Sequence, residues 1–391
     1  MSKSVILFTR GTMGDIYPFL HIGRKLKTLG CDIIFMSNFR YRDNAEQEGF
    51  EFVALDDEAW FDYLNNVPES KRKLPALLKL YKDIIPATTE KELALIESKI
   101  ESPENTIILA HSNDYMTSMM AKEKYNIPLH LCVLAPSFVH SIQFFESVCK
   151  NASLQVNQVR ENVGLLPVQD WEQWVRGFND VFAFWPQWFS CGKSNEVQEM
   201  ENVGFPSVGH VDQNALQPEV TKFIDSEKKV VAISHGTSRP FRDNYFCDAI
   251  EACRNTGRKL LVITPFREYV PDNISEDKDV LVVDYCPFHE LIPQIDLLIH
   301  HGGIGTVRES IASGTPQLII GKGYDRPHNG RIVKGLTVGD WIAPNALSSE
   351  TIKASIELIL NSEDIASSCE LHKEYMVEHQ VENKFYSKIL E

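Results

Sequence analysis

Residues 4–36 read SVILFTRGTMGDIYPFLHIGRKLKTLGCDIIFM and contain one complete strand-helix-strand unit. The apolar run Val5–Phe8 predicts a buried strand, and a glycine-bearing loop follows it. Apolar residues then recur at helical spacing from Ile16 to Leu26, and Ile33–Met36 supplies the next strand. Strands connected in this way run parallel, and the loop lies at the carboxyl edge of the sheet, where ligands bind in open α/β folds. The sequence therefore predicts a ligand site in this loop.

The same alternation continues along the chain, and helical stretches such as residues 243–256 separate the strands. A proline-bearing stretch without strong periodicity, residues 204–229, divides the chain in two. We therefore predict an α/β protein of two doubly wound, Rossmann-like domains facing a cleft. Further strands are expected at Thr106–Ala110, Leu129–Leu134, Val230–Ser234, Leu260–Thr264, Val280–Asp284, Leu297–His300 and Gln317–Ile320. The expected limits are 1–204 for the N-terminal domain, 205–229 for the linker, 230–372 for the C-terminal domain and 373–391 for a C-terminal helix that could pack back on the N-terminal domain.

The composition excludes several classes of protein. The 391 residues include 39 Lys and Arg against 54 Asp and Glu, a formal charge of −15, so that binding to nucleic acid is not expected. The eight cysteines show no Cys-x-x-Cys pair, which indicates reduced thiols in a cytoplasmic protein without structural zinc. The N-terminus fits a first strand better than a signal peptide, and no apolar run approaches the roughly 20 residues that span a bilayer. Any contact with a membrane is expected to be peripheral.

The strongest local motif is His300-His301-Gly302-Gly303-Ile304-Gly305-Thr306, between an apolar strand and a helix that opens at Val307. Glycines let an anion approach the backbone, and a helix N-terminus offers free N–H groups and positive partial charge. The motif therefore predicts a diphosphate cradle, with His301 and Thr306 as donors. A tight strand-to-helix turn whose glycines serve packing alone is the alternative.

This motif, together with Ser313-Gly314-Thr315-Pro316-Gln317 and Asp325-Arg326-Pro327-His328-Asn329, resembles the donor-binding region of the family 1 glycosyltransferases, which have the GT-B fold. Near the N-terminus, Gly11-Thr12-Met13-Gly14-Asp15-Ile16-Tyr17-Pro18-Phe19-Leu20 resembles the Gly-Ser-Arg-Gly-Asp-Val-x-Pro-Phe-Leu loop of the bacterial natural-product and sterol members. The resemblance runs from residue 4 to about 345. It is weakest at residues 56–100 and 136–202, which shape the acceptor pocket in this family.

The resemblance implies an inverting, metal-independent transfer of a sugar from a nucleotide diphosphate to a hydroxyl of a small hydrophobic acceptor. The donor is a substrate, and no permanently bound cofactor is expected. Either Tyr285 or Phe288 would stack on the base, or these rings belong to the core. The residues carried over to the donor site are Gly14, Gly236, Thr237, Ser238, Tyr285, Phe288, His301, Gly303, Gly305, Thr306, Glu309, Asp325 and Arg326.

Asp15 is the candidate general base, because it occupies the slot where bacterial and sterol relatives carry an aspartate and plant relatives a histidine. A partly buried carboxylate can take the acceptor proton as the oxygen attacks the anomeric carbon. The alternative role, as N-cap of the first helix, is compatible with catalysis. His111 and His140 are candidates to orient this base or to line the acceptor side, although a lone histidine is more often structural.

Two donor-side residues bear on specificity. Glu309 lies at the spacing where many relatives place a glutamate on the nucleotide ribose, which favours UDP over dTDP; the alternative is an ion pair with Arg308. Arg326 stands where most relatives have glutamine. Arg326 would either bind a carboxylate on the donor sugar or form a salt bridge with another residue. In the second case the donor sugar would be glucose or a hexosamine.

The acceptor is the least specified substrate. A concentration of aromatic residues would line an apolar pocket or form core, and the basic, amphipathic stretch Lys71–Lys82 would contact anionic lipid or solvent. Glycolipid-precursor transfer at a membrane surface and a non-catalytic nucleotide-sugar binding module are the alternative functions, and a sugar-nucleotide epimerase shares the architecture. The aromatic residues are Trp171, Trp174, Phe182, Phe184, Trp185, Trp188 and Phe189.

Overall fold

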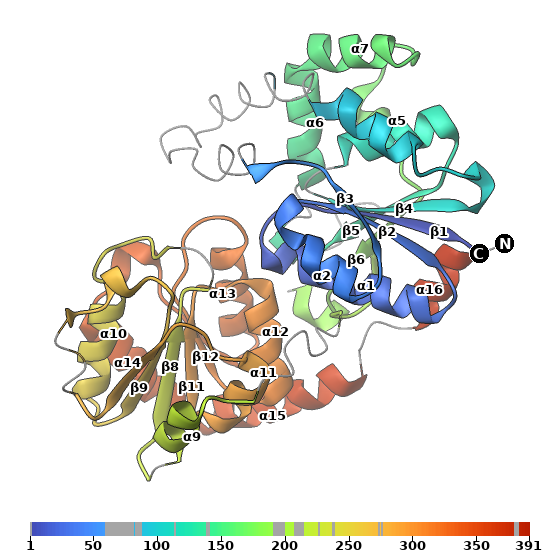
Figure 1. Ribbon diagram of the computed structural model, residues 1–391. Coiled ribbons are helices and arrows are strands. Elements are labelled where there is room, and N and C mark those ends of the chain that lie inside the picture. Colours follow the sequence, from blue (N-terminus) through green and yellow to red (C-terminus); the bar gives the residue numbers. More distant parts are fainter. Residues whose placement is uncertain are drawn as a thin grey trace. The chain divides into compact units, whose positions relative to one another are not determined.

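The computed structural model forms two compact units, each with its own parallel sheet (Figure 1). The first unit comprises Met1–Trp185, Ser194–Ser207 and Val381–Glu391, and the second comprises Pro186–Lys193 and Val208–Gln380. The structure describes residues 2–58, 82, 88–112, 115–137, 141–190, 200–206, 215–225, 227–236, 239–272, 274, 277–378 and 383–391.

The first unit contains a seven-stranded sheet in the order β3-β2-β1-β4-β5-β6-β7. Its central strands β1 and β4 are mostly apolar and buried, as expected for a parallel sheet covered on both faces, although β4 ends with the buried His111. The strands are β1 (Ser4–Phe8), β2 (Asp32–Ser37), β3 (Glu51–Ala54), β4 (Thr106–His111), β5 (Leu129–Val133), β6 (Asp180–Ala183) and β7 (Met200–Asn202). The helices are α1 (Met13–Thr28), α2 (Arg42–Gln47), α5 (Met116–Tyr125), α6 (Ser141–Asn151), α7 (Ser153–Asn162), α8 (Trp171–Val175) and α16 (Asn383–Leu390).

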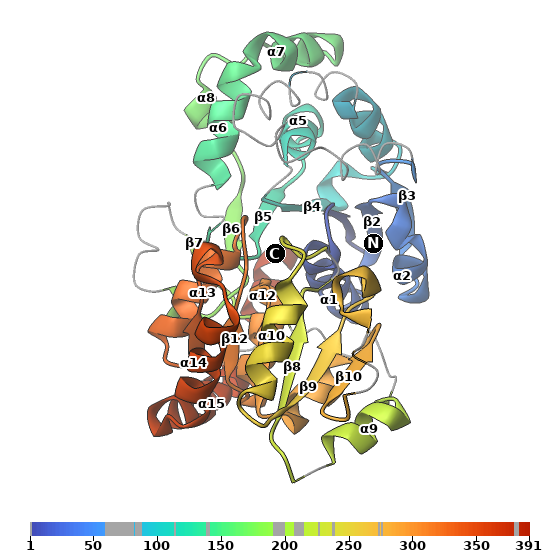
Figure 2. The same ribbon diagram turned by 90° about the vertical axis from the view of Figure 1, so that its left-hand side faces the viewer.

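The second unit contains a six-stranded sheet in the order β10-β9-β8-β11-β12-β13. In both views this sheet lies between α10 and α14 on one face and α12 and α15 on the other (Figures 1 and 2). The strands are β8 (Val230–Ser234), β9 (Lys259–Ile263), β10 (Val280–Val283), β11 (Leu297–His300), β12 (Gln317–Ile319) and β13 (Gly339–Trp341). The helices are α9 (Pro218–Ile224), α10 (Tyr245–Arg254), α11 (Phe288–Leu291), α12 (Ile304–Ser313), α13 (Arg326–Gly335), α14 (Ser349–Leu360) and α15 (Glu363–Glu378).

Both sheets reverse their strand order at one internal position. In the first unit β2 pairs with one side of β1 and β4 pairs with the other side, where Phe8 lies opposite Ala110. In the second unit β8 and β11 are the corresponding neighbours, with Ser234 opposite His300. Ligands bind at such switch points, beyond the carboxyl ends of the strands. The loops that follow these four strands are therefore where each unit offers a site.

The predicted two doubly wound domains are confirmed, but two of the predicted limits differ from the structure. The expected linker, residues 205–229, includes α9, whose Val220 is fully buried against the core of the second unit. The boundary expected after residue 372 falls inside α15, because no glycine or proline interrupts residues 363–382. The last helix is the shorter α16. The positions of the remaining limits stay a prediction.

The C-terminal helix α16 packs on the sheet of the first unit. The Phe385 ring lies edge-on against Phe182 of β6 and Phe184, which follows that strand, with ring centres 4.8 and 5.3 Å apart. Phe385 is fully buried, so the end of the chain contributes to the same core as β1 and α1. No helix in the described ranges combines the length and the apolar character needed to cross a bilayer.

Candidate functional site

The loop after β1 places Asp15 in the first turn of α1. The residue that caps the helix is Thr12, whose backbone is extended at φ −90° and ψ 176°. The Thr12 N–H and hydroxyl donate to Oδ2 of Asp15 at 2.8 and 3.1 Å. The expected N-cap role of Asp15 is therefore wrong in detail: the carboxylate bonds back to the cap from the third helical position.

His111 ends β4 beside this carboxylate. Its Nε2 lies 3.9 Å from Oδ1 of Asp15, and its ring meets Phe19 edge-on at 6.0 Å. Burial lowers the pKa of His111, against the opposing effect of Asp15, so the imidazole is neutral at neutral pH. The Asp15 side chain is 23% exposed, whereas His111 is fully buried. The structure thus brings both predicted catalytic residues together, with Asp15 as the one that solvent can reach; His140 lies outside the described residues.

At the switch point of the second unit, His301 is held between two glycine backbones. A Cβ on Gly236 would lie 2.7 Å from Cε1 of His301, and a Cβ on Gly303 would lie 2.6 Å from its Nε2. Gly302 has φ +90°, and a Cβ there would lie 2.7 Å from Cγ2 of Ile319. Gly236 and Gly303 are therefore required for packing around the His301 imidazole, and Gly302 for its backbone conformation and its packing against Ile319. The His301 Nδ1 is buried and has no hydrogen-bond partner among the described residues.

Two other glycines of the predicted site, Gly305 and Gly14, have open space where a Cβ would lie. A Cβ on Gly305 would meet nothing within 4 Å beyond its own helix, and one on Gly14 would meet only Oγ1 of Thr12, at 3.8 Å. Each is the second residue of its helix, α12 or α1, where N–H groups have no partner within the helix. Packing explains Gly302 and Gly303 but neither of these two glycines. Open space beside the N–H groups is what an approaching anion requires.

His300, for which the sequence predicted no role, is shown by the structure to be part of the framework of the glycine loop. It is fully buried at the end of β11, where its Nδ1 accepts a hydrogen bond from the Gly302 N–H at 3.2 Å. Its Nε2 lies 2.9 Å from Oε1 of Gln317, a contact in which the imidazole is the donor. Burial lowers the pKa of His300 to about 4. A neutral imidazole therefore fixes the first turn of the glycine loop.

Acidification is expected to destabilise the protein through His300. Because its pKa falls from 6.5 to about 4 on folding, the unfolded chain binds more protons in that window, and stability is lost as the pH falls through it. Between pH 7 and pH 5 the loss amounts to about 2 kcal/mol. Urea unfolding at both values should show this fall in the free energy of unfolding, and a smaller fall in His300→Asn. An equal fall in both proteins would show that His300 does not titrate in this way.

Asn329 connects the glycine loop to Asp325. Its fully buried Nδ2 donates to the Gly302 carbonyl at 2.9 Å and to Oδ2 of Asp325 at 2.7 Å. Asp325 stands immediately before α13, and Arg326 opens that helix. Burial lowers the pKa of Arg326, against the effect of Asp325, and its guanidinium carbon lies 6.0 Å from the centre of the Tyr324 ring. The two residues predicted to meet the sugar are therefore tied to the predicted diphosphate loop.

The remaining donor-side residues differ in exposure and in their contacts. Tyr285 is 50% exposed, whereas Phe288 packs against the core of the second unit, so Tyr285 is the aromatic ring that a base could meet. Glu309 accepts a hydrogen bond from Nη2 of Arg308 at 2.6 Å. Thr306 follows Gly305 in the first turn of α12. The predicted contacts Thr237 and Ser238 lie outside the described residues.

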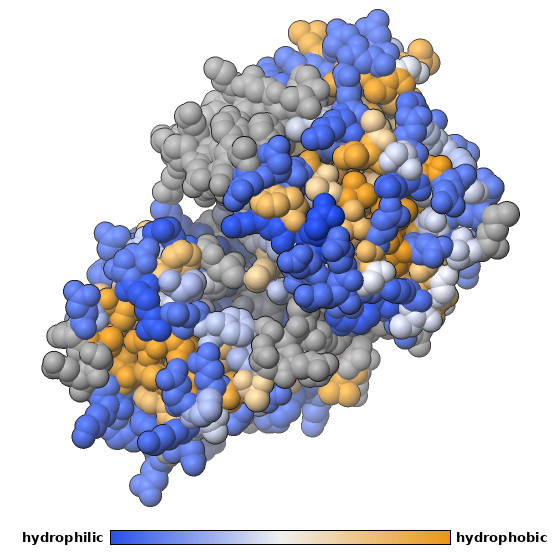
Figure 3. All heavy atoms as spheres, in the orientation of Figure 1, coloured by the Kyte–Doolittle hydropathy of each residue, from blue (hydrophilic) through white to orange (hydrophobic). Residues whose placement is uncertain are grey.

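Most of the aromatic residues considered for the acceptor belong to the core. Phe182, Phe184, Trp185 and Phe189 are at most 1% exposed, so they do not line an open pocket in this structure. Trp171 and Trp174 of α8 are partly exposed and meet edge-on at 5.8 Å. The surface of the first unit also shows hydrophobic residues among hydrophilic ones (Figure 3). Residues 71–81 of the basic stretch lie outside the described residues.

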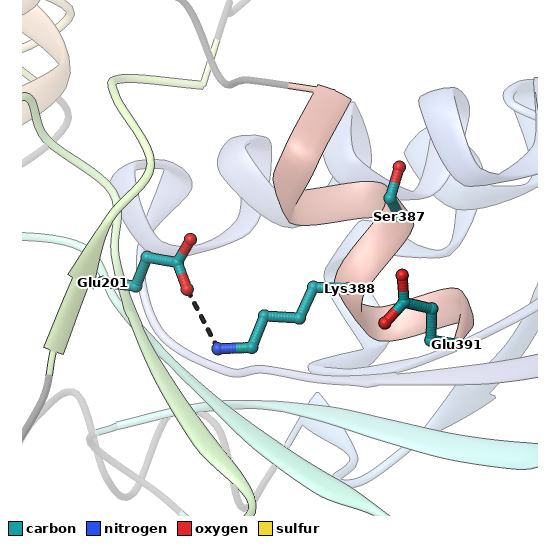
Figure 4. Close-up of a pocket in the computed structure, with 4 residues that line it drawn as sticks. All are labelled: Glu201, Ser387, Lys388 and Glu391. Carbon is teal, nitrogen blue, oxygen red and sulfur yellow. Dashed lines mark hydrogen bonds and ion pairs between the residues drawn. The ribbon is translucent and has the colours of Figure 1, made fainter.

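A pocket beside α16 lies away from the candidate site. It is lined by Glu201, Ser387, Lys388 and Glu391, and Lys388 reaches toward Glu201 of β7 (Figure 4). The Lys388 Nζ lies 2.9 Å from Oε2 of Glu201 and 2.8 Å from Oδ1 of Asp180, where β6 begins. This is the amino edge of the sheet, opposite to Asp15. In the described part of the chain, no group of three or more His, Cys, Asp or Glu side chains is arranged to hold a metal ion.

Comparison with known protein families gives two matches. Residues 5–143 match the glycosyltransferase family 28 N-terminal domain. Residues 262–381 match the erythromycin biosynthesis protein CIII-like C-terminal domain. Together these matches include the Asp15 loop, His111 and the region from His300 to Arg326.

Relatives of similar length extend this likeness over the whole chain. O-mycaminosyltylonolide 6-deoxyallosyltransferase from Streptomyces fradiae is 22% identical over 362 residues, which are 83% of this chain and 81% of that protein. The solved glycosyltransferase of kitacinnamycin is 15% identical and matches all of both chains with a TM-score of 0.78. Glycosyltransferase VinC in complex with dTDP is 13% identical, with a TM-score of 0.74 over 99% of this chain and 98% of that one. On these findings the chain belongs to the family 1 glycosyltransferases and has the GT-B fold.

Proposed function

We propose that this enzyme moves a sugar from a nucleotide diphosphate, UDP in preference to dTDP, to a hydroxyl of a small hydrophobic natural product, with inversion at the anomeric carbon. The observation that carries this proposal is the partly exposed Asp15 carboxylate, with Oδ2 held by Thr12 and Oδ1 facing the neutral His111. A transfer by a single displacement requires one general base that can reach the acceptor hydroxyl, and a partly exposed carboxylate meets this requirement.

In the proposed reaction Asp15 takes the proton of the acceptor hydroxyl while the hydroxyl oxygen bonds to the anomeric carbon. The bond from that carbon to the diphosphate oxygen breaks, and the nucleotide diphosphate leaves with the electron pair. His111 is fully buried, so its proposed role is to orient Asp15 and not to contact the acceptor. No metal ion is invoked in this mechanism.

On the donor side, the negative charge that develops on the diphosphate is proposed to meet His301, Thr306 and the N–H groups at the start of α12. Preorganised donors of this kind stabilise a leaving group without reorganisation. The open space beside Gly305 supports this assignment. Asp325 would accept from sugar hydroxyls and Tyr285 would stack on the base. For Arg326, both a carboxylate on the sugar and an ordinary hexose remain proposals.

Nucleotide preference tests the donor assignment. We expect UDP to bind about 10-fold more tightly than dTDP, because a carboxylate at Glu309 can accept from both ribose hydroxyls. Calorimetric titration with each nucleotide measures the two dissociation constants. dUDP serves as the matched ligand, since it differs from UDP only at the 2′-position.

The outcome separates Glu309 from the base. If dUDP binds like dTDP, and Glu309→Gln makes UDP and dUDP equal, the ribose contact accounts for the preference. Tighter binding of dTDP would contradict it and leave Glu309 as the partner of Arg308, with 2.6 Å between Oε1 and Nη2. The solved relative in complex with dTDP is the observation that favours this second donor class.

A further inference from the structure

Gly11, in the loop that carries Asp15, is hydrogen-bonded on both sides of its Cα to the segment that follows β2. The Gly11 N–H donates to Oδ1 of Asn38 at 2.8 Å, and its carbonyl accepts a hydrogen bond from the Tyr41 hydroxyl at 3.2 Å. Gly11 has φ +138°, and a Cβ there would overlap Oδ2 of Asp15. The Asp15 carboxylate thus lies directly against the Gly11 backbone. The Gly11–Thr12 peptide therefore joins the two sides: its carbonyl accepts from Tyr41, and its N–H donates to Asp15.

Asn38 is itself oriented by a second carboxylate. Its Nδ2 donates to Oδ2 of Asp56 at 2.6 Å, and the Phe39 N–H donates to Oδ1 of Asp56 at 2.7 Å. Asn38 is 4% exposed and Asp56 is 8% exposed. A buried carboxylate accepts only, so Asp56 binds the amide nitrogen and turns the amide oxygen toward Gly11. The order of contacts is Asp56, Asn38, Gly11, Asp15.

We infer that Asn38 and Asp56 are positioning residues for the glycosyl transfer, which hold the Gly11 backbone and, through it, the Asp15 carboxylate in the geometry that takes the acceptor proton. The inference rests on the proposed role of Asp15. Both side chains are buried and act through the loop without touching substrate. Tyr41 completes the attachment, since burial, aided by Asp15, raises its pKa to about 12 and keeps its hydroxyl protonated as a donor.

Exchanging the two side chains tests the inference. Asn38→Asp alone sets two carboxylates against each other, and Asp56→Asn alone sets two amide nitrogens against each other. The double variant N38D/D56N restores all three hydrogen bonds: the new carboxylate accepts from Gly11 and from the new amide, whose oxygen accepts from Phe39. We expect each single variant to lower kcat by about 10- to 100-fold, the usual cost of a misplaced catalytic group. The double variant should recover most of that loss.

The readouts distinguish positioning from general stability. The dissociation constant for UDP should stay unchanged in all three variants, and kcat is compared per folded molecule after urea unfolding gives the folded fraction. Wild-type kcat in both single variants, or a folded double variant as slow as the single ones, would overturn the inference. Tyr41→Phe is the milder variant, with an expected loss of about fivefold for one hydrogen bond; no loss there would count against the inference even if Asn38→Asp does not fold.

Asp15→Asn, assayed in parallel, separates this inference from the proposed function. Wild-type kcat in Asp15→Asn would remove Asp15 as the base, and the positioning role would fall with it. A slow Asp15→Asn beside a wild-type Asn38→Asp would leave the proposed function standing and refute the positioning role alone.

Discussion

Replacing Asp15 by asparagine is expected to lower kcat by about 10²- to 10⁴-fold, the contribution typical of a general base, while the affinity for UDP stays at its wild-type value. The amide is nearly isosteric, and its oxygen can still accept from the Thr12 N–H and hydroxyl, so that α1 keeps its cap. What the variant loses is an oxygen able to take a proton. Turnover of a UDP-sugar with a hydrophobic acceptor, followed by separation of product and donor, measures the change.

A matched control variant tests whether the loss of kcat comes from a less stable helix. Asp43 also lies in the first turn of a helix, α2, and is exposed. Asp43→Asn should therefore turn over like the wild type. If Asp15→Asn retains wild-type kcat, the base must lie elsewhere. The anomeric configuration of the wild-type product is the companion measurement, because retention would contradict a single displacement by one carboxylate.

Much of the fold could be predicted because buried parallel strands read as unbroken apolar runs. β8 and β11 coincide with the predicted Val230–Ser234 and Leu297–His300. The strands that were missed include β7 and β13, three residues each at the edges of their sheets, with the sequences MEN and GDW. An edge strand is paired on one side only, so little apolar pattern is needed to hold it there.

The candidate site divides in the same way. The proximity of Asp15 and His111 could be predicted from the sequence. Asp15 lies shortly after β1 and His111 ends β4, and neighbouring parallel strands have their carboxyl ends side by side. The contacts of Asn38 with Asp56, and of His300 with Gln317, could not. Each joins two buried polar side chains through a hydrogen bond that depends on exact packing, and no periodicity or motif marks such a pair. Nor could the sequence predict which of Tyr285 and Phe288 is available to a ligand, because the two rings differ only in how deeply they are buried.

Replacing His301 by alanine is expected to weaken UDP binding by about 10- to 100-fold, the usual range for a lost hydrogen bond to a charged group. The imidazole lies between the backbones of Gly236 and Gly303, so its position is fixed before any ligand arrives. Burial, aided by Arg326 and the neighbouring histidines, lowers its pKa well below the ordinary value, so the proposed contact with the diphosphate is that of a neutral donor. Calorimetric titration with UDP measures the change, and His301→Gln, which keeps an N–H donor, should recover part of the affinity.

The two variants should lose different properties: His301→Ala should lose affinity for UDP, whereas Asp15→Asn should lose kcat alone. In the proposed mechanism His301 acts on the leaving group, so its removal should weaken the binding of both the nucleotide and the transition state. Asp15 is proposed to act on the acceptor proton, so its removal should leave nucleotide binding unchanged. Wild-type UDP affinity in His301→Ala would remove this side chain from the diphosphate contacts. The adjacent His300 would not take its place, because both of its ring nitrogens are already engaged, by Gly302 and by Gln317. The diphosphate would then depend on the backbone N–H groups of α12 and on Thr306, and Gly305→Ala, which fills the open space beside them, would become the decisive variant.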